Sequence, residues 1–311
     1  NIHNDLIRIG EQAFAGCTAL TALNVAGSVG EIEYHAFYGA ALSSADISVA
    51  NIGARVFEGC TRLTSVTLRD TAFLDDYAFL GCSALRTVTI GEGTTLDTIG
   101  LSPFNGCTSF TDFAVSRNNR NFRIKRDNGY TLLYNADATK LLLAPTGYAP
   151  SAGYNFNGLT TIGSSAYANS GISVDTLVIP EGITEIGDFA FGFNRFSTVI
   201  LPASLETIGV GAFYGCANLK SVVFLGDKVK TLPSSLFYGC TSLVSVDLPR
   251  GLETINAGAF YGCSALGVIN IPASVGAIGN NAFAGCTSLK TVKFDNASRL
   301  ATIGSGCFMS A

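Results

Sequence analysis

One motif of about two dozen residues recurs from one end of the 311-residue chain to the other. It is clearest at residues 278–294, IGNNAFAGCTSLKTVKF, and its pattern is I-G-x-x-A-F-x-G-C-x-x-L-x-x-V-x-F. Successive copies are 20 to 25 residues apart, with one interval of 63. The first position of the motif falls at Ile9, Ile32, Ile52, Leu74, Ile99, Ile162, Ile186, Ile208, Leu232, Ile255, Ile278 and Ile303. Repeats of this length predict a solenoid, because each unit buries its apolar face only against its neighbours.

The apolar spacing within a repeat changes from helix-like to strand-like. Ile278, Ala282, Phe283 and Cys286 are separated by 4, 1 and 3 residues, whereas the apolar residues at 292 and 294 alternate. Each repeat is therefore predicted to form a short helical turn followed by a short strand, and the strands are predicted to stack in parallel.

Two side-chain columns are predicted to fill the interior. The aromatic column is phenylalanine in eleven repeats and Tyr167 in one, which predicts a buried spine of stacked rings. Nine cysteines each follow a glycine, and eight of them share one column. An odd count spread over the repeats favours buried free thiols over disulfides, metal ligands or redox groups.

Glycine and proline positions predict backbone detail. The glycine before cysteine is replaced by Asn169 in one repeat, so this position is expected to have positive φ. Phe193 occupies this position in another repeat, where a positive φ is unfavourable for phenylalanine. We expect a conflict there unless Gly192, one residue earlier, has the positive φ instead. The glycine after isoleucine is replaced by Pro233 in one repeat and so needs no positive φ. The strands are expected to stop before Pro180, Pro202, Pro249 and Pro272.

The long interval between Ile99 and Ile162 holds about 40 extra residues. Within it, FRIKR, YTLLY and KLLLA at 122–126, 130–134 and 140–144 are separated by turn residues, which predicts an antiparallel meander. We predict N-terminal repeats at 1–115, an insertion at 116–158 and C-terminal repeats at 159–311, all in one continuous array.

Because the isoleucine, phenylalanine, Gly-Cys and strand positions recur together, the repeat resembles the leucine-rich repeats of the BspA-like, or treponemal, class, as found in Bacteroidetes. The resemblance covers residues 9 to 308 and implies a leucine-rich repeat solenoid of the α/β horseshoe type. It also implies a bacterial cell-surface or secreted protein that adheres to a host or bacterial protein or to a glycan. The first residues show no export signal, so the predicted location comes from the resemblance alone.

Composition and residue types restrict the chemistry. A hydrophobic fraction of 48% indicates a folded chain, the net charge of −4 provides no field for nucleic acid, and no apolar run is long enough to span a membrane. The two histidines, His3 and His35, are far apart, and His35 is expected to be solvated. We predict no enzyme activity, no cofactor and no metal. A hydrolytic site in the insertion would have to use Asp127 and Asp137.

A first candidate surface is the outer face of the predicted sheet. Most outward residues there are small and polar, but Val178, Ile200 and Val223 form an apolar stripe in three successive repeats. The stripe is either a partner-binding patch or sheet surface that the insertion covers.

A second candidate surface is the basic run SRNNRNFRIKR. It places five of the 19 basic residues in ten positions without an acid: Arg117, Arg120, Arg123, Lys125 and Arg126. Together with Asn118, Asn119 and Asn121 they could bind a polyanion, or they could form a solvated segment that pairs with the acidic remainder. Strand alternation predicts Arg123 and Lys125 on one face.

The sequence thus predicts a noncatalytic surface or secreted protein that binds a macromolecule, either protein or glycan. The alternative is an accessory carbohydrate-binding or spacer module of a larger surface enzyme.

Overall fold

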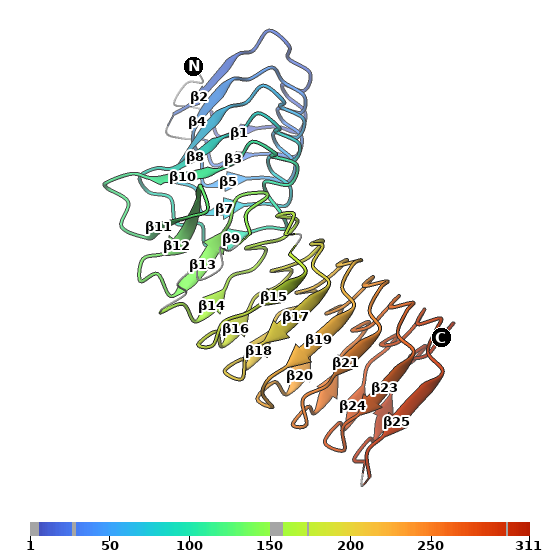
Figure 1. Ribbon diagram of the computed structural model, residues 1–311. Helices are drawn as coiled ribbons and strands as arrows, with labels where there is room; N and C mark the ends of the chain where they lie inside the picture. The colour runs from blue at the N-terminus through green and yellow to red at the C-terminus, as the bar shows by residue number, and fades with distance from the viewer. Residues whose placement is uncertain (1–5, 27–28, 150–157, 173, 297) are drawn as a thin grey trace. The chain divides into compact units, whose positions relative to one another are not determined.

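The fold was analysed in a computed structural model that describes residues 6–26, 29–149, 158–172, 174–296 and 298–311. The chain forms two compact units, Asn1–Tyr154 and Asn155–Ala311. In each unit the described residues form a parallel β-solenoid, in which each rung contributes one two-residue strand and, except in the last rung, one longer strand (Figure 1). The finer division at residues 115 and 158 stays a prediction.

The longer strands form three sheets. In the first unit they are β2 (Ala22–Val25), β4 (Ser44–Ser48), β6 (Ser65–Arg69), β8 (Thr87–Ile90) and β10 (Asp112–Val115). In the second unit they are β15 (Thr176–Val178), β17 (Thr198–Leu201), β19 (Ser221–Phe224), β21 (Ser245–Asp247), β23 (Val268–Ile271) and β25 (Thr291–Phe294). The second residue of each of these strands except β25 is buried and the residues beside it are less so, as in β6, where Val66 and Leu68 point inward. The predicted binding stripe lies on the sheet made by β15, β17, β19 and β21.

The two-residue strands each consist of the first residue of a motif, the isoleucine or leucine, and the residue before it. In the first unit they are β1 (Arg8–Ile9), β3 (Glu31–Ile32), β5 (Asn51–Ile52), β7 (Phe73–Leu74) and β9 (Thr98–Ile99). In the second unit they are β14 (Thr161–Ile162), β16 (Glu185–Ile186), β18 (Thr207–Ile208), β20 (Thr231–Leu232), β22 (Thr254–Ile255), β24 (Ala277–Ile278) and β26 (Thr302–Ile303). Motif positions pair in register from rung to rung, for example Ile32 with Ile52.

The predicted meander is present in the first unit. It consists of β11 (Phe122–Asp127), β12 (Tyr130–Asn135) and β13 (Lys140–Leu143), which pair antiparallel in that order. Residues 150–157 of the predicted insertion lie outside the described residues. The four prolines act as expected, since β15, β17, β21 and β23 each end before the proline that follows them.

The predicted helical turns are wrong, because the described residues contain no helix. Every described turn that follows a two-residue strand of a rung has two residues with positive φ, such as Arg55 at 56° and Gly59 at 71°. Alternate N–H groups consequently point to different partners. Arg55, Phe57 and Gly59 donate to carbonyls of the next rung, at 2.8 to 3.0 Å, whereas Glu58 and Cys60 donate within their own rung, both at 3.1 Å. A helix would keep all these donors within one segment and lose the bonds between rungs.

The aromatic spine is confirmed. Neighbouring rings of the column have centroids 5.0 to 5.7 Å apart and are stacked in both units; the pairs are Phe14–Phe37, Phe37–Phe57, Phe57–Phe79, Phe79–Phe104, Tyr167–Phe191, Phe191–Phe213, Phe213–Phe237, Phe237–Phe260, Phe260–Phe283 and Phe283–Phe308. Their faces cover one another, so each ring is removed from water by its neighbours.

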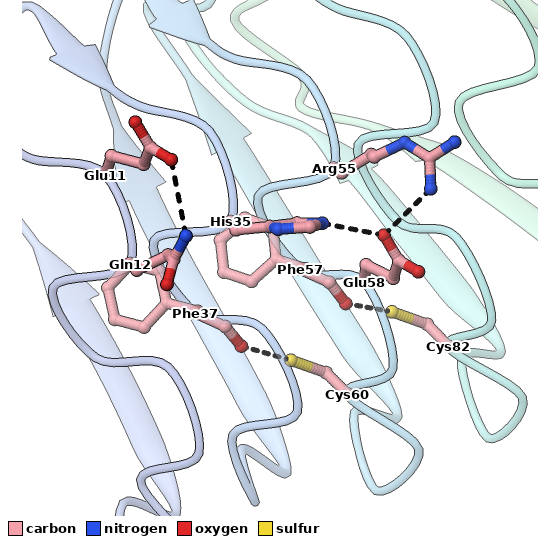
Figure 2. Close-up of polar contacts among 9 residues, drawn as sticks. All are labelled: Glu11, Gln12, His35, Phe37, Arg55, Phe57, Glu58, Cys60 and Cys82. Atoms are coloured by element: carbon pink, nitrogen blue, oxygen red, sulfur yellow. Dashed lines mark hydrogen bonds and ion pairs between the residues drawn. The ribbon is translucent and has the colours of Figure 1, made fainter.

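The nine thiols are free, as predicted, and eight of them are buried. Seven also donate a hydrogen bond that the sequence did not suggest. Figure 2 shows two of these: the Sγ atoms of Cys60 and Cys82 lie 3.1 Å from the carbonyl oxygens of Phe37 and Phe57, one rung earlier. Each of these oxygens already accepts an N–H from its own rung. The thiol therefore satisfies a second lone pair in the interior.

Asn194 replaces cysteine in this column and makes equivalent bonds. Its Nδ2 donates to the carbonyl oxygens of Tyr167 and Phe191 at 2.7 and 3.0 Å.

The glycine before cysteine has positive φ in every described repeat that carries it there, and Asn169 takes the same conformation. The expectation for Phe193 is wrong, because Phe193 itself has φ of 59° and Gly192 does not substitute for it. Its ring lies over Gly215 of the next rung, where an added Cβ would be 2.8 Å from the ring. The absence of a side chain at Gly215 thus makes room for the unusual conformation of Phe193.

Candidate binding surfaces

The predicted apolar stripe forms one row across three neighbouring strands of the second unit. Val178 on β15 pairs with Ile200 on β17, which pairs with Val223 on β19. Val178 is 58% exposed, and the other two side chains are half-buried. We refer to Val178, Ile200 and Val223 as the apolar row.

Hydroxyl groups flank the apolar row on the same outer face. Thr176, Thr198 and Ser221 pair with one another in the same way, two residues earlier on each strand. At β21 the apolar row ends at Asp247, which pairs with Val223. An apolar centre with a polar margin is typical of surfaces that bind macromolecules.

The equivalent face of the first unit is polar. There Asn24, Asp46, Thr67 and Thr89 occupy the positions that correspond to the apolar row. Asp46 accepts two hydrogen bonds from the guanidinium of Arg69, at 2.7 and 3.1 Å, and this pairing raises the pKa of Arg69. The two outer faces therefore differ in chemistry although their backbones repeat the same pattern.

The basic side chains of the run do not all lie on one face of β11. Arg117, Arg120, Arg123 and Arg126 are exposed, and the Nζ of Lys125 lies 4.9 Å from the ring centroid of Tyr134. In β11, alternation places Arg123 and Lys125 on one face and Arg126 on the other. Arg126 is within 3.8 Å of Asp112.

The asparagines of this run have a structural role. Asn119 is buried, and its Nδ2 donates to the carbonyl oxygens of Gly91 and Thr94 at 2.7 and 2.9 Å. Asn118 donates to Glu92. These bonds hold the 116–121 loop to the loop after β8, so Asn118 and Asn119 are engaged with the fold.

A polar cluster lies on the turns of the first unit (Figure 2). The Oε2 of Glu58 is 2.9 Å from the Nε2 of His35 and 3.1 Å from a guanidinium nitrogen of Arg55. Desolvation by burial would raise the pKa of Glu58, but the hydrogen bonds from His35 and Arg55 outweigh it and lower that pKa. His35 is not solvated as expected, because only 20% of its side chain is exposed.

The two acids considered for hydrolysis are kept apart. Asp127 ends β11 beside the turn to β12 and accepts a hydrogen bond from the Tyr148 hydroxyl at 2.7 Å. Asp137 is exposed beyond the opposite end of β12. Six residues of strand separate these ends by about 20 Å, so the carboxylates cannot act as a pair.

The part of the chain that the structure describes contains no group of three or more histidine, cysteine or acidic side chains placed to hold a metal ion. His3 lies outside it. The described residues also form no helix that is long and apolar enough to cross a membrane.

An external row of tyrosines was missed by the sequence reasoning. Tyr214, Tyr238 and Tyr261, here called the tyrosine row, follow the spine phenylalanine in three successive repeats of the second unit. Tyr214 and Tyr238 are stacked with centroids 4.8 Å apart, and Tyr238 and Tyr261 with centroids 4.6 Å apart. The recurring letters F-Y-G-C were the available signal.

Comparisons with known proteins agree with this architecture. The family model described as "BspA type Leucine rich repeat region" matches residues 1–111, 160–290 and 212–311, in six copies. No curated protein sequence matches the chain.

Solved structures share the fold. A leucine-rich repeat protein from Eubacterium ventriosum ATCC 27560 is 22% identical, with a TM-score of 0.68, and the match covers 94% of this chain and 82% of that one. A leucine-rich repeat protein from Bacteroides ovatus ATCC 8483 is 29% identical, with a TM-score of 0.50 and coverage of 98% and 80%. The pneumococcal vaccine antigen PcpA is 22% identical, with a TM-score of 0.53 and coverage of 94% and 61%.

Proposed function

The chain belongs to the BspA-type leucine-rich repeat family, and on that premise we propose that it is a noncatalytic cell-surface or secreted protein that binds a macromolecular partner. The partner is a protein or a glycan, and binding serves adhesion. Proteins of this repeat family are generally noncatalytic, and the proposed location follows from the family resemblance.

One observation carries the proposal: the apolar row crosses three adjacent strands in register, with Val178 exposed. Partly exposed apolar side chains aligned on a sheet provide surface that a partner can bury, at about 25 cal/mol per Å² of apolar area. The threonine and serine hydroxyls beside the row can hydrogen-bond to the same partner. The polar outer face of the first unit lacks this combination.

The substitution Ile200→Asp tests the proposal because it puts a charge at the centre of the row. We expect the native protein to bind at least one member of an array of matrix proteins and glycans. The variant should bind that member about tenfold or more weakly, since a buried, unpaired charge is costly, and should keep the native midpoint of chemical denaturation.

The matched control is Thr67→Asp, which places the same charge at the equivalent position of β6 in the first unit. It should bind as the native protein does. Unchanged binding by Ile200→Asp would contradict the proposal, and unfolding of that variant would show that the row is part of the core.

A second candidate function is polyanion binding by the basic run. Four exposed arginines favour it, because among the described residues only Arg126 of the run has an acid within 4 Å, at 3.8 Å. The sulfate groups of a glycan or the carboxylates of an acidic protein would provide the negative charges that these arginines lack. Retention on heparin tests this proposal, as described in the Discussion.

A further inference from the structure

We propose that the tyrosine row, together with Phe189 and Phe193, is a second binding surface, and that its ligand is an uncharged polysaccharide. This surface lies on the turns of the second unit and uses no residue of the apolar row. It therefore goes beyond the proposed function and can fail or succeed independently of it.

The fold does not require aromatic residues at these positions. The same column, directly after the spine phenylalanine, holds small or aliphatic side chains in other repeats: Ala15, Leu80, Ala168 and Ala284. Three tyrosines in successive rungs consequently do more than fill space. They are half-buried, so part of each tyrosine stays in contact with water, where a ligand can cover it.

The aromatic surface is continuous over four rungs. Phe193 and Phe189 are tilted against Tyr214, with ring centroids at 5.4 and 5.8 Å, and the stack then continues through Tyr238 to Tyr261. Tyr214, Tyr238, Tyr261 and Phe189 are half-buried, and Phe193 is exposed. In the next rung the column is Ala284, so the stack ends at Tyr261.

The rings of Phe189 and Phe193 occupy space that two glycines of the next rung leave open. The rings lie over Gly211 and Gly215, where an added Cβ would come within 2.6 and 2.8 Å of Phe189 and Phe193. The two glycines therefore leave the space that the two rings occupy. Rings that already pack against one another lose less conformational freedom on binding than isolated side chains would.

The hydroxyl groups restrict the chemistry of the ligand. Within the described part of the chain, no side-chain hydrogen bond engages the hydroxyls of the tyrosine row, and none of the three is buried. Burial of the ring and the neighbouring Tyr238 raise the pKa of Tyr214, so its hydroxyl remains neutral and can donate. An entirely apolar ligand would strip water from these hydroxyls without replacing it, whereas a sugar can exchange hydrogen bonds with them.

Charges are few on this surface. The segments that carry the tyrosine row, 210–215, 234–239 and 257–262, contain no charged residue, and the segment with Phe189 and Phe193 adds one acid and one base, Asp188 and Arg195. Neither a polyanion nor a polycation would meet a run of opposite charge here. The stacked rings cover one another's faces, so the row presents ring edges and hydroxyl groups. A neutral ligand rich in hydroxyl groups, such as an uncharged sugar, matches this surface.

The regular spacing favours a polymer over a single sugar. The rings recur at 4.6 and 4.8 Å, which is the spacing of adjacent strands. A linear chain lying along the rungs would meet equivalent groups repeatedly, so that each weak contact adds to one binding event.

Native affinity electrophoresis tests the proposal, with gels containing xyloglucan, galactomannan, laminarin or soluble starch. We expect at least one of these to retard the native protein. Tyr238→Ala should weaken the interaction about tenfold or more. Because the chain has no tryptophan, the same polysaccharide should also change its tyrosine fluorescence.

The controls separate this surface from the others. Tyr38→Ala removes the tyrosine of the same column in the first unit and should leave retardation unchanged, as should Ile200→Asp. Tyr238→Phe keeps the stack and removes one hydroxyl, so it should weaken binding less than alanine does. The proposal is overturned if none of the four polysaccharides retards the native protein, or if Tyr238→Ala and Tyr238→Phe are both retarded as strongly as the native protein.

Discussion

At the scale of single residues, the interior depends on side chains that repeat exact contacts from rung to rung. Phe260 is fully buried and stacked between Phe237 and Phe283, at centroid distances of 5.4 and 5.0 Å. The thiol of Cys286 donates to its carbonyl oxygen at 3.2 Å. A change at one rung therefore affects both neighbours.

We predict that Phe260→Ala lowers the free energy of unfolding by about 3–5 kcal/mol, because it leaves a cavity in the spine. Phe294→Ala is the matched control, since Phe294 is 44% exposed on β25, and it should cost less than about 1 kcal/mol. Chemical denaturation measures both. A loss below about 1 kcal/mol for Phe260→Ala would contradict the buried spine.

The residue scale also shows what the sequence could not reveal about the cysteines. Their burial was predictable from the column, because a repeated small apolar residue belongs inside. Their hydrogen bonds depend on how far the preceding rung lies and which carbonyl it presents. The backbone conformation of the turn sets both this distance and the direction of that carbonyl.

At the scale of elements, strands were predictable and turns were not. The strands follow from alternation, from β-branched residues and from the prolines that end them. The turns have apolar spacing like that of a helix, but hydrogen bonds to the next rung replace those of a helix. Periodicity within one repeat contains no information about bonding between repeats.

The exposed arginines of strand β11 and of the loop before it are expected to bind polyanions such as heparin. Replacing Arg117, Arg120, Arg123 and Arg126 by serine should abolish retention on heparin in about 50 mM salt, because the exposed cations that would replace counterions are lost. Heparin affinity chromatography over a salt gradient measures the effect.

A control variant removes the same charge elsewhere, by replacing the exposed residues Arg62, Arg86, Arg195 and Lys290 with serine. It should be retained as the native protein is. Equal loss of retention in both variants would indicate that net charge alone governs binding, and would argue against a site on β11.

At the scale of the whole molecule, the thiol columns make stability sensitive to alkaline pH. Burial raises the pKa of Cys60 and Cys216 to about 12, and that of Cys286 to about 11. The pKa values of Cys240 and Cys263 are raised as well, mainly by burial. Unfolded thiols ionise near 9, so between pH 9 and about 12 only the unfolded chain loses these protons.

We therefore predict that ionisation of these thiols leaves the free energy of unfolding unchanged below pH 9 and lowers it above pH 9. Each thiol that ionises only in the unfolded chain contributes a slope of about −1.4 kcal/mol per pH unit. Urea denaturation at pH 8 to 10.5 measures the slope.

The variant Cys240→Ala/Cys263→Ala should reduce the slope above pH 9 by up to about 2.7 kcal/mol per pH unit, because two titrating groups are gone. The control Ser264→Ala/Ser288→Ala removes no ionisable group and should leave the slope unchanged. Equal slopes for the native protein and the double variant would show that the buried thiols do not contribute.

The sequence by itself determined the number and spacing of the rungs, the aromatic spine, the cysteine column and the meander, because each of these depends on which side chains recur and how often. The tertiary structure decided the backbone of the turns, the partners of the thiols and the external tyrosine row. These features depend on atoms of adjacent rungs, about 4.8 Å apart in space but two dozen residues apart in the chain, and they exist only once the rungs have stacked.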